Sequence, residues 1–275
     1  MMNRVFESGC MVIINKTKNV KQQFSNDKNL ITRIGFYKKY TTNKYKFSDW
    51  LFDKYKFNEN QYILELGCGN GNHWEGRIEK LPQGCRIVLS DFSDGMLKLV
   101  NEKFCLLHNV SVQKIDIQSI PFESNLFDVV IANHMLFHVP NLNKALLEVK
   151  RVLKKGGCFY SATDGDGGMR PFLHNAIKKF DVHSKAFTEK LPFSLQNGDK
   201  ILSKFFNSVK KFTYENVLSV TKTEDLMNWL KSTCSISGFS EKNFIELYEY
   251  FENVRLTNGG AIKIPRETGI FISVK

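Results

Sequence analysis

The feature that most constrains the fold is a glycine-rich turn, Gly67-Cys68-Gly69-Asn70-Gly71, directly after the apolar run 61–66. An apolar run that stops at clustered glycines is typical of a buried strand leading into a tight turn. Apolar runs and helix-periodic segments then alternate over about a hundred residues, the spacing of parallel βαβ units. The sequence therefore predicts an α/β fold with a doubly wound, mainly parallel sheet.

The expected elements follow this alternation. Five strands are predicted in the first half of the sheet, at 61–66, 86–90, 110–115, 127–132 and 158–162. Helices are expected from the glycine turn to residue 81, and at 93–107 and 143–153. The remaining predicted segments are helical at 47–55, 171–181, 195–206, 224–231 and 241–256, and extended at 209–214 and 269–274. Residues 1–30 are polar and aperiodic, and we expect them to be partly mobile.

Charge adds little about chemistry. The net charge is +11 with a pI of about 9.3, but residues 61–164 are neutral, whereas residues 1–60 contribute +7 and residues 165–275 contribute +4. Compositional bias explains scattered lysines of this kind, and an anionic partner remains the alternative.

No apolar run approaches the roughly 18 residues of a membrane span, and no secretory signal is evident, so we expect a cytoplasmic protein without membrane insertion. Six cysteines without a Cys-x-x-Cys pair or a Cys/His cluster favour reduced thiols over zinc ligands or disulfides.

Two carboxylates follow strands in register with the glycine turn. In open α/β sheets, ligands bind outside the carboxyl ends of the strands. Asp91 ends the second predicted strand, where it can accept both hydroxyls of a ribose. Asp116 ends the third, where it can accept from an adenine amino group, with Ile117 as an apolar neighbour. A dinucleotide fingerprint would need its third glycine at Asn72, and a phosphate loop would need Gly-Lys-Ser/Thr, so neither is present.

These residues match a known family. The matching motifs are Glu65-Leu66-Gly67-Cys68-Gly69-Asn70-Gly71, Leu89-Ser90-Asp91-Phe92-Ser93-Asp94-Gly95-Met96-Leu97, Ile115-Asp116-Ile117, Ile120-Pro121-Phe122, Phe127-Asp128-Val129-Val130, Asn133-His134-Met135-Leu136-Phe137-His138-Val139 and Arg151-Val152-Leu153-Lys154-Lys155-Gly156-Gly157. In order and spacing, residues 60–163 resemble the class I S-adenosylmethionine-dependent methyltransferases. The most similar branch includes ubiquinone/menaquinone biosynthesis enzymes and other small-molecule methyltransferases.

The resemblance implies a Rossmann-like, seven-stranded sheet and a cofactor, S-adenosyl-L-methionine, that leaves as S-adenosyl-L-homocysteine. The pattern of predicted elements divides the chain into an N-terminal extension with a helix packed on the core (1–57), a cofactor-binding half (58–163), and the rest of the sheet with inserted helices forming a substrate lid (164–275). Tyr37 and Tyr40 either close over the cofactor or pack beneath it. The cofactor-binding residues that the resemblance implies are Glu65, Gly67, Cys68, Gly69, Gly71, Asp91, Phe92, Met96, Asp116, Ile117, Asn133 and His134.

Methyl transfer from a sulfonium is an in-line displacement, so a base is needed only when the nucleophile carries a proton. His134 is the first candidate base and His138 the second, each with a structural role as the alternative. No metal site is expected. The loop at Asn133-His134-Met135-Leu136 lacks the Asn/Asp-Pro-Pro-aromatic pattern of enzymes that methylate exocyclic base amines or Asn/Gln side-chain amides, which favours a small-molecule O, N or C acceptor.

Two other functions stay open. An RNA-directed methyltransferase would use the basic, aromatic N-terminal extension, and a non-catalytic module would bind the cofactor alone. A monomer or a homodimer is expected in either case.

Overall fold

A seven-stranded sheet with the strand order β3-β2-β1-β4-β5-β7-β6 forms the centre of the molecule. The computed structural model describes residues 27–233 and 241–275, so the expected mobility of residues 1–30 falls mostly outside the described part. The first five strands are parallel, and β7 is antiparallel to β5 and β6, which confirms the predicted mainly parallel, doubly wound sheet. The strands are β1 Tyr62–Leu66, β2 Arg86–Asp91, β3 Val110–Lys114, β4 Phe127–Asn133, β5 Leu153–Asp164, β6 Ser208–Val220 and β7 Ile262–Val274.

Alternating side chains of the parallel strands build a core on each face of the sheet. Leu64 and Val88 pack in a cluster with α5 and α7, whereas their neighbours Ile63 and Ile87 pack with α3 and α4. This period of two is what a strand buried on both faces requires. The helices are α2 Lys28–Tyr40, α3 Phe47–Phe52, α4 Asp94–Phe104, α5 Leu142–Val152, α6 Met169–Ile177, α7 Gly198–Leu202, α8 Thr223–Lys231 and α9 Glu241–Thr257.

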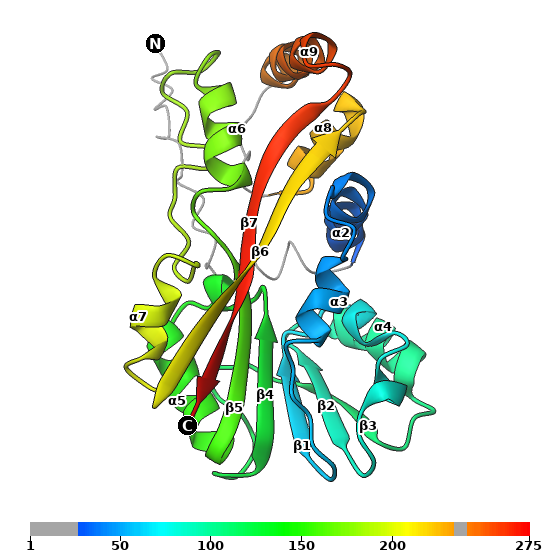
Figure 1. Cartoon of the computed structure of the whole chain (residues 1–275), viewed down its shortest axis with the longest axis vertical. Helices are drawn as coiled ribbons and strands as arrows, with labels where there is room; N and C mark the ends of the chain where they lie inside the picture. Colours follow the sequence, from blue (N-terminus) through cyan, green and yellow to red (C-terminus); the bar gives the residue numbers. More distant parts are fainter. Residues whose placement is uncertain (1–26, 234–240) are drawn as a thin grey trace, which may run out of the picture.

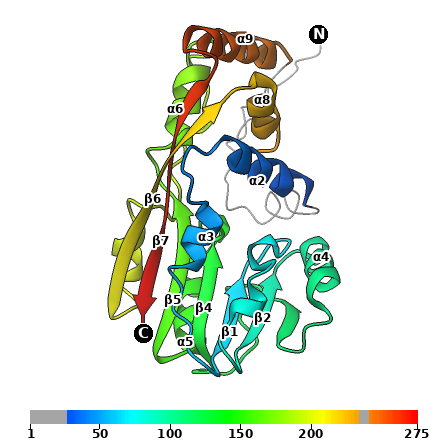
Figure 2. The same cartoon turned by 45° about the vertical axis from the view of Figure 1, so that its right-hand side comes forward.

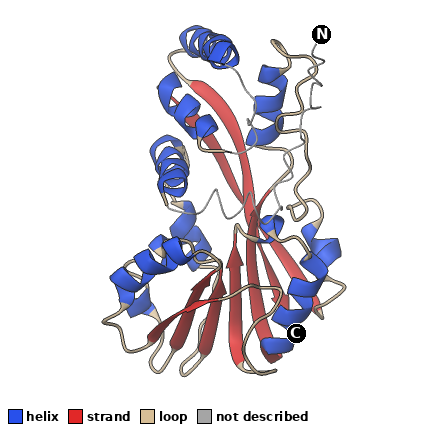
Figure 3. Cartoon of the chain, turned by 180° about the vertical axis from the view of Figure 1, so that it is seen from behind, coloured by secondary structure: helices blue, strands red, loops and turns tan. Residues whose placement is uncertain are grey.

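The last two strands extend beyond the sheet as a two-stranded ribbon. Pairing of β5 with β7 ends at Asp164 and Thr268, but pairing of β6 with β7 continues to Val220 and Ile262. Helices α2, α6, α8 and α9 pack around this ribbon in a third hydrophobic cluster, and we call this assembly the upper lobe (Figures 1 and 2). Seen from behind, the ribbon connects the sheet to the upper lobe (Figure 3).

Several predicted boundaries were wrong. The segment after the glycine turn is not one helix but two short 3-10 turns, η1 Asn72–Trp74 and η2 Ile78–Lys80. Gly76 lies between them with a φ of 65°, a left-handed conformation that an α-helix cannot contain. Helix α2 was not predicted, the helix expected at 195–206 shortens to α7, and β6 and β7 are each about twice as long as predicted.

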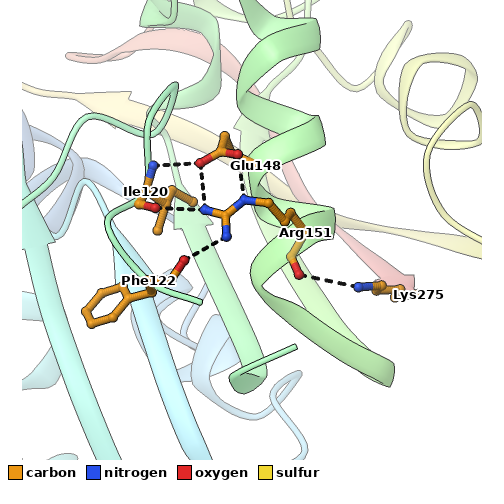
Figure 4. Close-up of polar contacts among 5 residues, drawn as sticks. All are labelled: Ile120, Phe122, Glu148, Arg151 and Lys275. Carbon is orange, nitrogen blue, oxygen red and sulfur yellow. Dashed lines mark hydrogen bonds and ion pairs between the residues drawn. The ribbon is translucent and has the colours of Figure 1, made fainter. Parts of the chain in front are cut away.

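A polar clamp fixes the loop between β3 and β4 to α5 (Figure 4). The guanidinium of Arg151 donates to both carboxylate oxygens of Glu148 at 2.7 and 2.8 Å. It also donates to the backbone carbonyls of Ile120, at 2.8 Å, and Phe122, at 2.7 Å. The Ile120 N–H closes the arrangement by donating to Glu148 at 2.8 Å. The loop that carries Asp116 is therefore held by charge-assisted hydrogen bonds at its far end.

Candidate functional site

The glycine turn leads from the carboxyl end of β1 into a cavity of about 1260 Å³. Gly67 and Gly69 have φ values of 72° and 57°, which side chains rarely adopt. A Cβ on Gly67 would lie 2.9 Å from Cγ of Met135, so a larger residue would displace the loop after β4. The turn therefore places bare backbone on the cavity wall, where a ligand can approach it closely.

Asp91, at the end of β2, joins the glycine turn to α4. One carboxylate oxygen accepts from the Gly69 N–H at 2.9 Å and the other accepts from the Ser93 N–H at 2.9 Å. Each carboxylate oxygen has a second lone pair, so Asp91 keeps the capacity to accept from two ligand hydroxyls. Burial raises its pKa, and the hydrogen bonds from Ser93 and Gly69 oppose that shift.

Asp116 and Ile117 occupy the next part of the wall. Asp116 accepts from the backbone N–H of Gln118 at 2.9 Å and from the Gln118 side-chain amide at 3.1 Å. Ile117 is 5% exposed and belongs both to the core under α5 and to the cavity lining. Phe92 also lines the cavity, as expected for a residue beside a planar base.

A buried polar network lies below the glycine turn. Glu65 is 2% exposed and accepts hydrogen bonds from the indole N–H of Trp74 and, at 3.1 Å, from the Asn133 amide. The same amide donates to the Tyr55 hydroxyl at 2.8 Å. Burial raises the pKa of Glu65 to about 7, while the hydrogen bonds from Trp74 and Asn133 oppose that rise. The Oδ1 atom of Asn133 is buried without a hydrogen-bond partner in the structure. A carboxylate and an unpartnered carbonyl oxygen together suit a ligand ammonium group.

His134 follows β4 in a left-handed conformation, with a φ of 52°. Its backbone N–H donates to Ala162 at 2.8 Å, and its ring packs edge-on against Phe47. Nδ1 lies 3.8 Å from a carboxylate oxygen of Asp164, and Nε2 is buried without a partner in the structure. Burial lowers the pKa of His134; Asp164 opposes this shift and Arg266 adds to it. The imidazole is therefore held neutral and able to accept a proton.

The other candidate histidine, His138, also lines the cavity and packs against the ring of Phe137. Cys68 also lines the cavity, and burial raises the pKa of its thiol well above the usual value. A thiol of raised pKa is a poor nucleophile, so Cys68 contributes backbone and volume rather than covalent chemistry.

Most of the predicted site residues meet in this one cavity, but two do not. Met96 is fully buried, because it lies on the face of α4 that packs on the sheet, and it does not line the cavity. Gly71 is also absent from the lining; a Cβ there would lie 2.8 Å from the ring of Phe104, so this glycine allows close packing with α4. The predicted residues that line the cavity are Glu65, Gly67, Cys68, Gly69, Asp91, Phe92, Asp116, Ile117, Asn133, His134 and His138.

The structure places the two tyrosines differently. Tyr37 lines the cavity, whereas Tyr40 is 3% exposed, packs against Phe36 and donates to Asp225. Sequence reasoning missed Asp164, Arg266 and Trp229, which line the cavity from β5, β7 and α8. No motif surrounds any of them, and only the fold brings them to the cavity that His134 lines.

Two further properties bear on the chemistry. No group of three His, Cys, Asp or Glu side chains positioned to hold a metal ion occurs within residues 27–233 and 241–275. Of the helices in the same ranges, none combines the length and apolarity needed to span a membrane.

Comparison with known proteins agrees with this geometry. Residues 64–161 match a family model described as a methyltransferase domain. A sterol 4-C-methyltransferase of Caenorhabditis elegans is 32% identical over 110 residues, which are 39% of this chain and 32% of that protein. A demethylmenaquinone methyltransferase of Staphylococcus aureus is 38% identical over 96 residues, which are 34% of this chain and 39% of that protein. The matches thus span well under half the length of these relatives.

Solved structures share the fold. The YcgJ protein of Bacillus subtilis superposes with a TM-score of 0.59 at 16% identity and covers 83% of this chain and 97% of its own. A phosphoethanolamine N-methyltransferase of Haemonchus contortus, solved with S-adenosyl-L-methionine, has a TM-score of 0.60 at 15% identity; it covers 96% of this chain and 60% of its own.

Proposed function

We propose, from the premise that residues 64–161 form a domain of the class I methyltransferase family, that this chain transfers a methyl group from S-adenosyl-L-methionine to a small-molecule O, N or C acceptor. The observation that carries the proposal is the convergence of the glycine turn, Asp91 and the Glu65–Asn133 network on one cavity. The turn admits a ligand to bare backbone, Asp91 can accept from ribose hydroxyls, and Glu65 with Asn133 suits the ammonium group of a methionine moiety.

When bound, the cofactor supplies an activated methyl group on a cationic sulfonium. The residues of this chain bind it, align the acceptor and exclude water, which are the main contributions that an in-line displacement requires. His134 directly follows Asn133 on the cavity wall and can take the proton of a hydroxyl or amine acceptor through its unpartnered Nε2. Asp164 is then a positioning residue, because it faces the other ring nitrogen.

The size of the cavity favours a small acceptor beside the cofactor. Its volume of about 1260 Å³ exceeds the roughly 300–1,000 Å³ of a pocket for a single drug-sized ligand. Helices α2, α6 and α8 contribute to its wall, so the acceptor would lie between the sheet and the upper lobe. A space between the sheet and the upper lobe suits a small molecule better than the base of a folded RNA.

The first test is cofactor binding. S-adenosyl-L-homocysteine is expected to raise the melting temperature, and Asp91→Asn, which keeps a polar side chain of the same shape, is expected to weaken its binding by about 1–3 kcal/mol. Isothermal titration measures the affinity, and the melting temperature without ligand shows whether the variant folds. Asp199→Asn, at an exposed position of α7, is the matched control. Equal affinity in the wild type and Asp91→Asn would contradict the site, and failure of the wild type to bind would contradict the function.

A further inference from the structure

The cavity is electrostatically divided. The wall around the glycine turn, which we call the cofactor end, carries the acidic side chains of Glu65, Asp91, Asp94 and Asp116 with the basic side chain of Lys114. Beside it, Arg77 is paired with Asp49 and Glu75 is paired with Lys103. The opposite end, where α2, α6 and β7 form the wall and which we call the acceptor end, carries Arg33, Lys38, Arg170 and Arg266 with Asp164 and Glu267. A sulfonium suits the first end, and the second end has a surplus of cations.

Arg266 lies at the acceptor end, where two aromatic rings hold its guanidinium in place and no carboxylate of the described residues pairs with it. Its central carbon lies 4.0 Å from the ring centroid of Tyr37 and 5.1 Å from that of Phe47. Contacts of this kind fix the plane of a guanidinium while leaving its N–H donors free to bind a ligand. Within the described residues, no ion pair is formed by Arg266, and its Nε is buried without a hydrogen-bond partner.

The acidic neighbours have other roles. Glu267 accepts from the backbone N–H of Gly167 at 2.7 Å and from the side-chain amide of Gln196 at 2.7 Å, so it holds the loop after β5. Asp164 lies 3.8 Å from His134. A buried guanidinium donor left without an acceptor is costly unless a ligand supplies one.

We infer that the acceptor carries a carboxylate or phosphate group, which Arg266 binds at the acceptor end of the cavity, and that Arg266 selects this class of substrate. A planar guanidinium matches either anion with two parallel hydrogen bonds. Met169, Phe187, Leu191 and Trp229 form an apolar part of the same wall, so the rest of the acceptor has an apolar body. This inference rests on the proposed methyl transfer, because it names the substrate class of that reaction.

The experiment is transfer of labelled methyl to a metabolite extract that an anion-exchange resin has separated into retained and unretained fractions. The wild type is expected to label the retained, anionic fraction. Arg266→Met keeps the apolar stem and removes the charge, and it should lower that labelling by at least about 30-fold, the effect of about 2 kcal/mol at a buried charge pair. Arg266→Lys keeps the positive charge but cannot donate two parallel hydrogen bonds to one anion, so it should give an intermediate rate. Lys263→Gln, an exposed charge on the same strand that donates to Ser219, is the matched control and should label like the wild type.

Binding of S-adenosyl-L-homocysteine, measured by titration, shows in parallel that each variant is folded and loaded. Labelling confined to the unretained fraction, or equal labelling by the wild type and Arg266→Met, overturns the anionic acceptor and leaves methyl transfer standing. Absence of label in both fractions, with cofactor bound by the wild type, overturns the proposed function and this inference together.

Discussion

The carboxyl group of Glu65 is buried from solvent, and this burial makes the stability of the protein depend on pH. Burial raises its pKa from 4.5 to about 7. Since the folded pKa lies above the unfolded one, the protonated carboxyl stabilises the fold fully below about pH 4.5, and this stabilisation disappears as the pH rises through 7. The shift corresponds to about 3 kcal/mol of unfolding free energy in the cofactor-free protein.

Glu65→Gln should remove that contribution. Chemical denaturation between pH 5 and 8 is expected to give a flatter stability profile for this variant than for the wild type, because the amide does not ionise. Glu123→Gln, at an exposed position, should follow the wild-type profile. Parallel profiles for Glu65→Gln and the wild type would show that Glu65 does not titrate in this range.

His134 allows a test of general-base catalysis that a purely structural role would not pass. Burial lowers its pKa and the Asp164 carboxylate opposes that shift, because a carboxylate stabilises the imidazolium. Asp164→Asn should therefore move the acidic limb of the pH profile of kcat to lower pH. An acidic limb that stays in place would assign Asp164 to a role other than positioning His134.

The proposed base can be removed without changing the backbone conformation. His134→Asn should lower kcat by about 10²–10⁴-fold, because asparagine tolerates the left-handed conformation but cannot act as a base. Titration with S-adenosyl-L-homocysteine checks that the cofactor end is intact. Retained kcat would mean that the acceptor reacts without losing a proton to His134.

At the scale of elements, the clamp around Arg151 links α5 to the loop that carries Asp116. Arg151→Met removes four hydrogen bonds, two of them to backbone carbonyls, and is expected to lower the free energy of unfolding by about 1–3 kcal/mol. It should also weaken cofactor binding, since the loop loses its anchor. Lys144→Met, an exposed lysine on the same helix, is the control for both measurements. A lower free energy of unfolding with unchanged cofactor affinity would show that anchoring of this loop does not contribute to cofactor binding.

The elements that the sequence predicted well are those in which local signals and tertiary packing agree. Strands β1, β2 and β4 are short, mostly apolar segments, and α4 and α5 begin at side-chain caps, Ser93 and Asn141. The strand β5 was recognised but begins five residues before the predicted start. The failures have physical causes. Gly76 interrupts a segment of helical composition, and β7 contains Pro265 between Lys263 and Arg266, where a strand is hard to recognise from its residues.

At the scale of the molecule, the two ends of the cavity differ in how far they could be predicted. The cofactor end is built from residues at the carboxyl ends of parallel strands, so topology alone brings Glu65, Asp91 and Asn133 together. The acceptor end combines Arg33, Trp229 and Arg266. Arg33 and Arg266 are more than 200 residues apart in the sequence, and the ribbon of β6 and β7 brings the three residues together. No local sequence pattern predicts this arrangement, because it depends on β6 and β7 being longer than their apolar residues indicate.

The upper lobe and the sheet have separate hydrophobic clusters, so we expect that a substitution can weaken acceptor binding without weakening cofactor binding. Phe251 is fully buried in the upper lobe and stacks on Phe172 at 5.9 Å, far along the ribbon from the glycine turn. Phe251→Ala should cost about 3–5 kcal/mol of unfolding free energy through the cavity that it leaves. Because the upper lobe supplies the acceptor end, the variant should raise KM for the acceptor and leave the affinity for S-adenosyl-L-homocysteine unchanged. Phe159→Ala, in the core under the sheet, should cost a similar amount while weakening cofactor binding. Equal losses of cofactor affinity in both variants would mean that sheet and upper lobe respond as one unit.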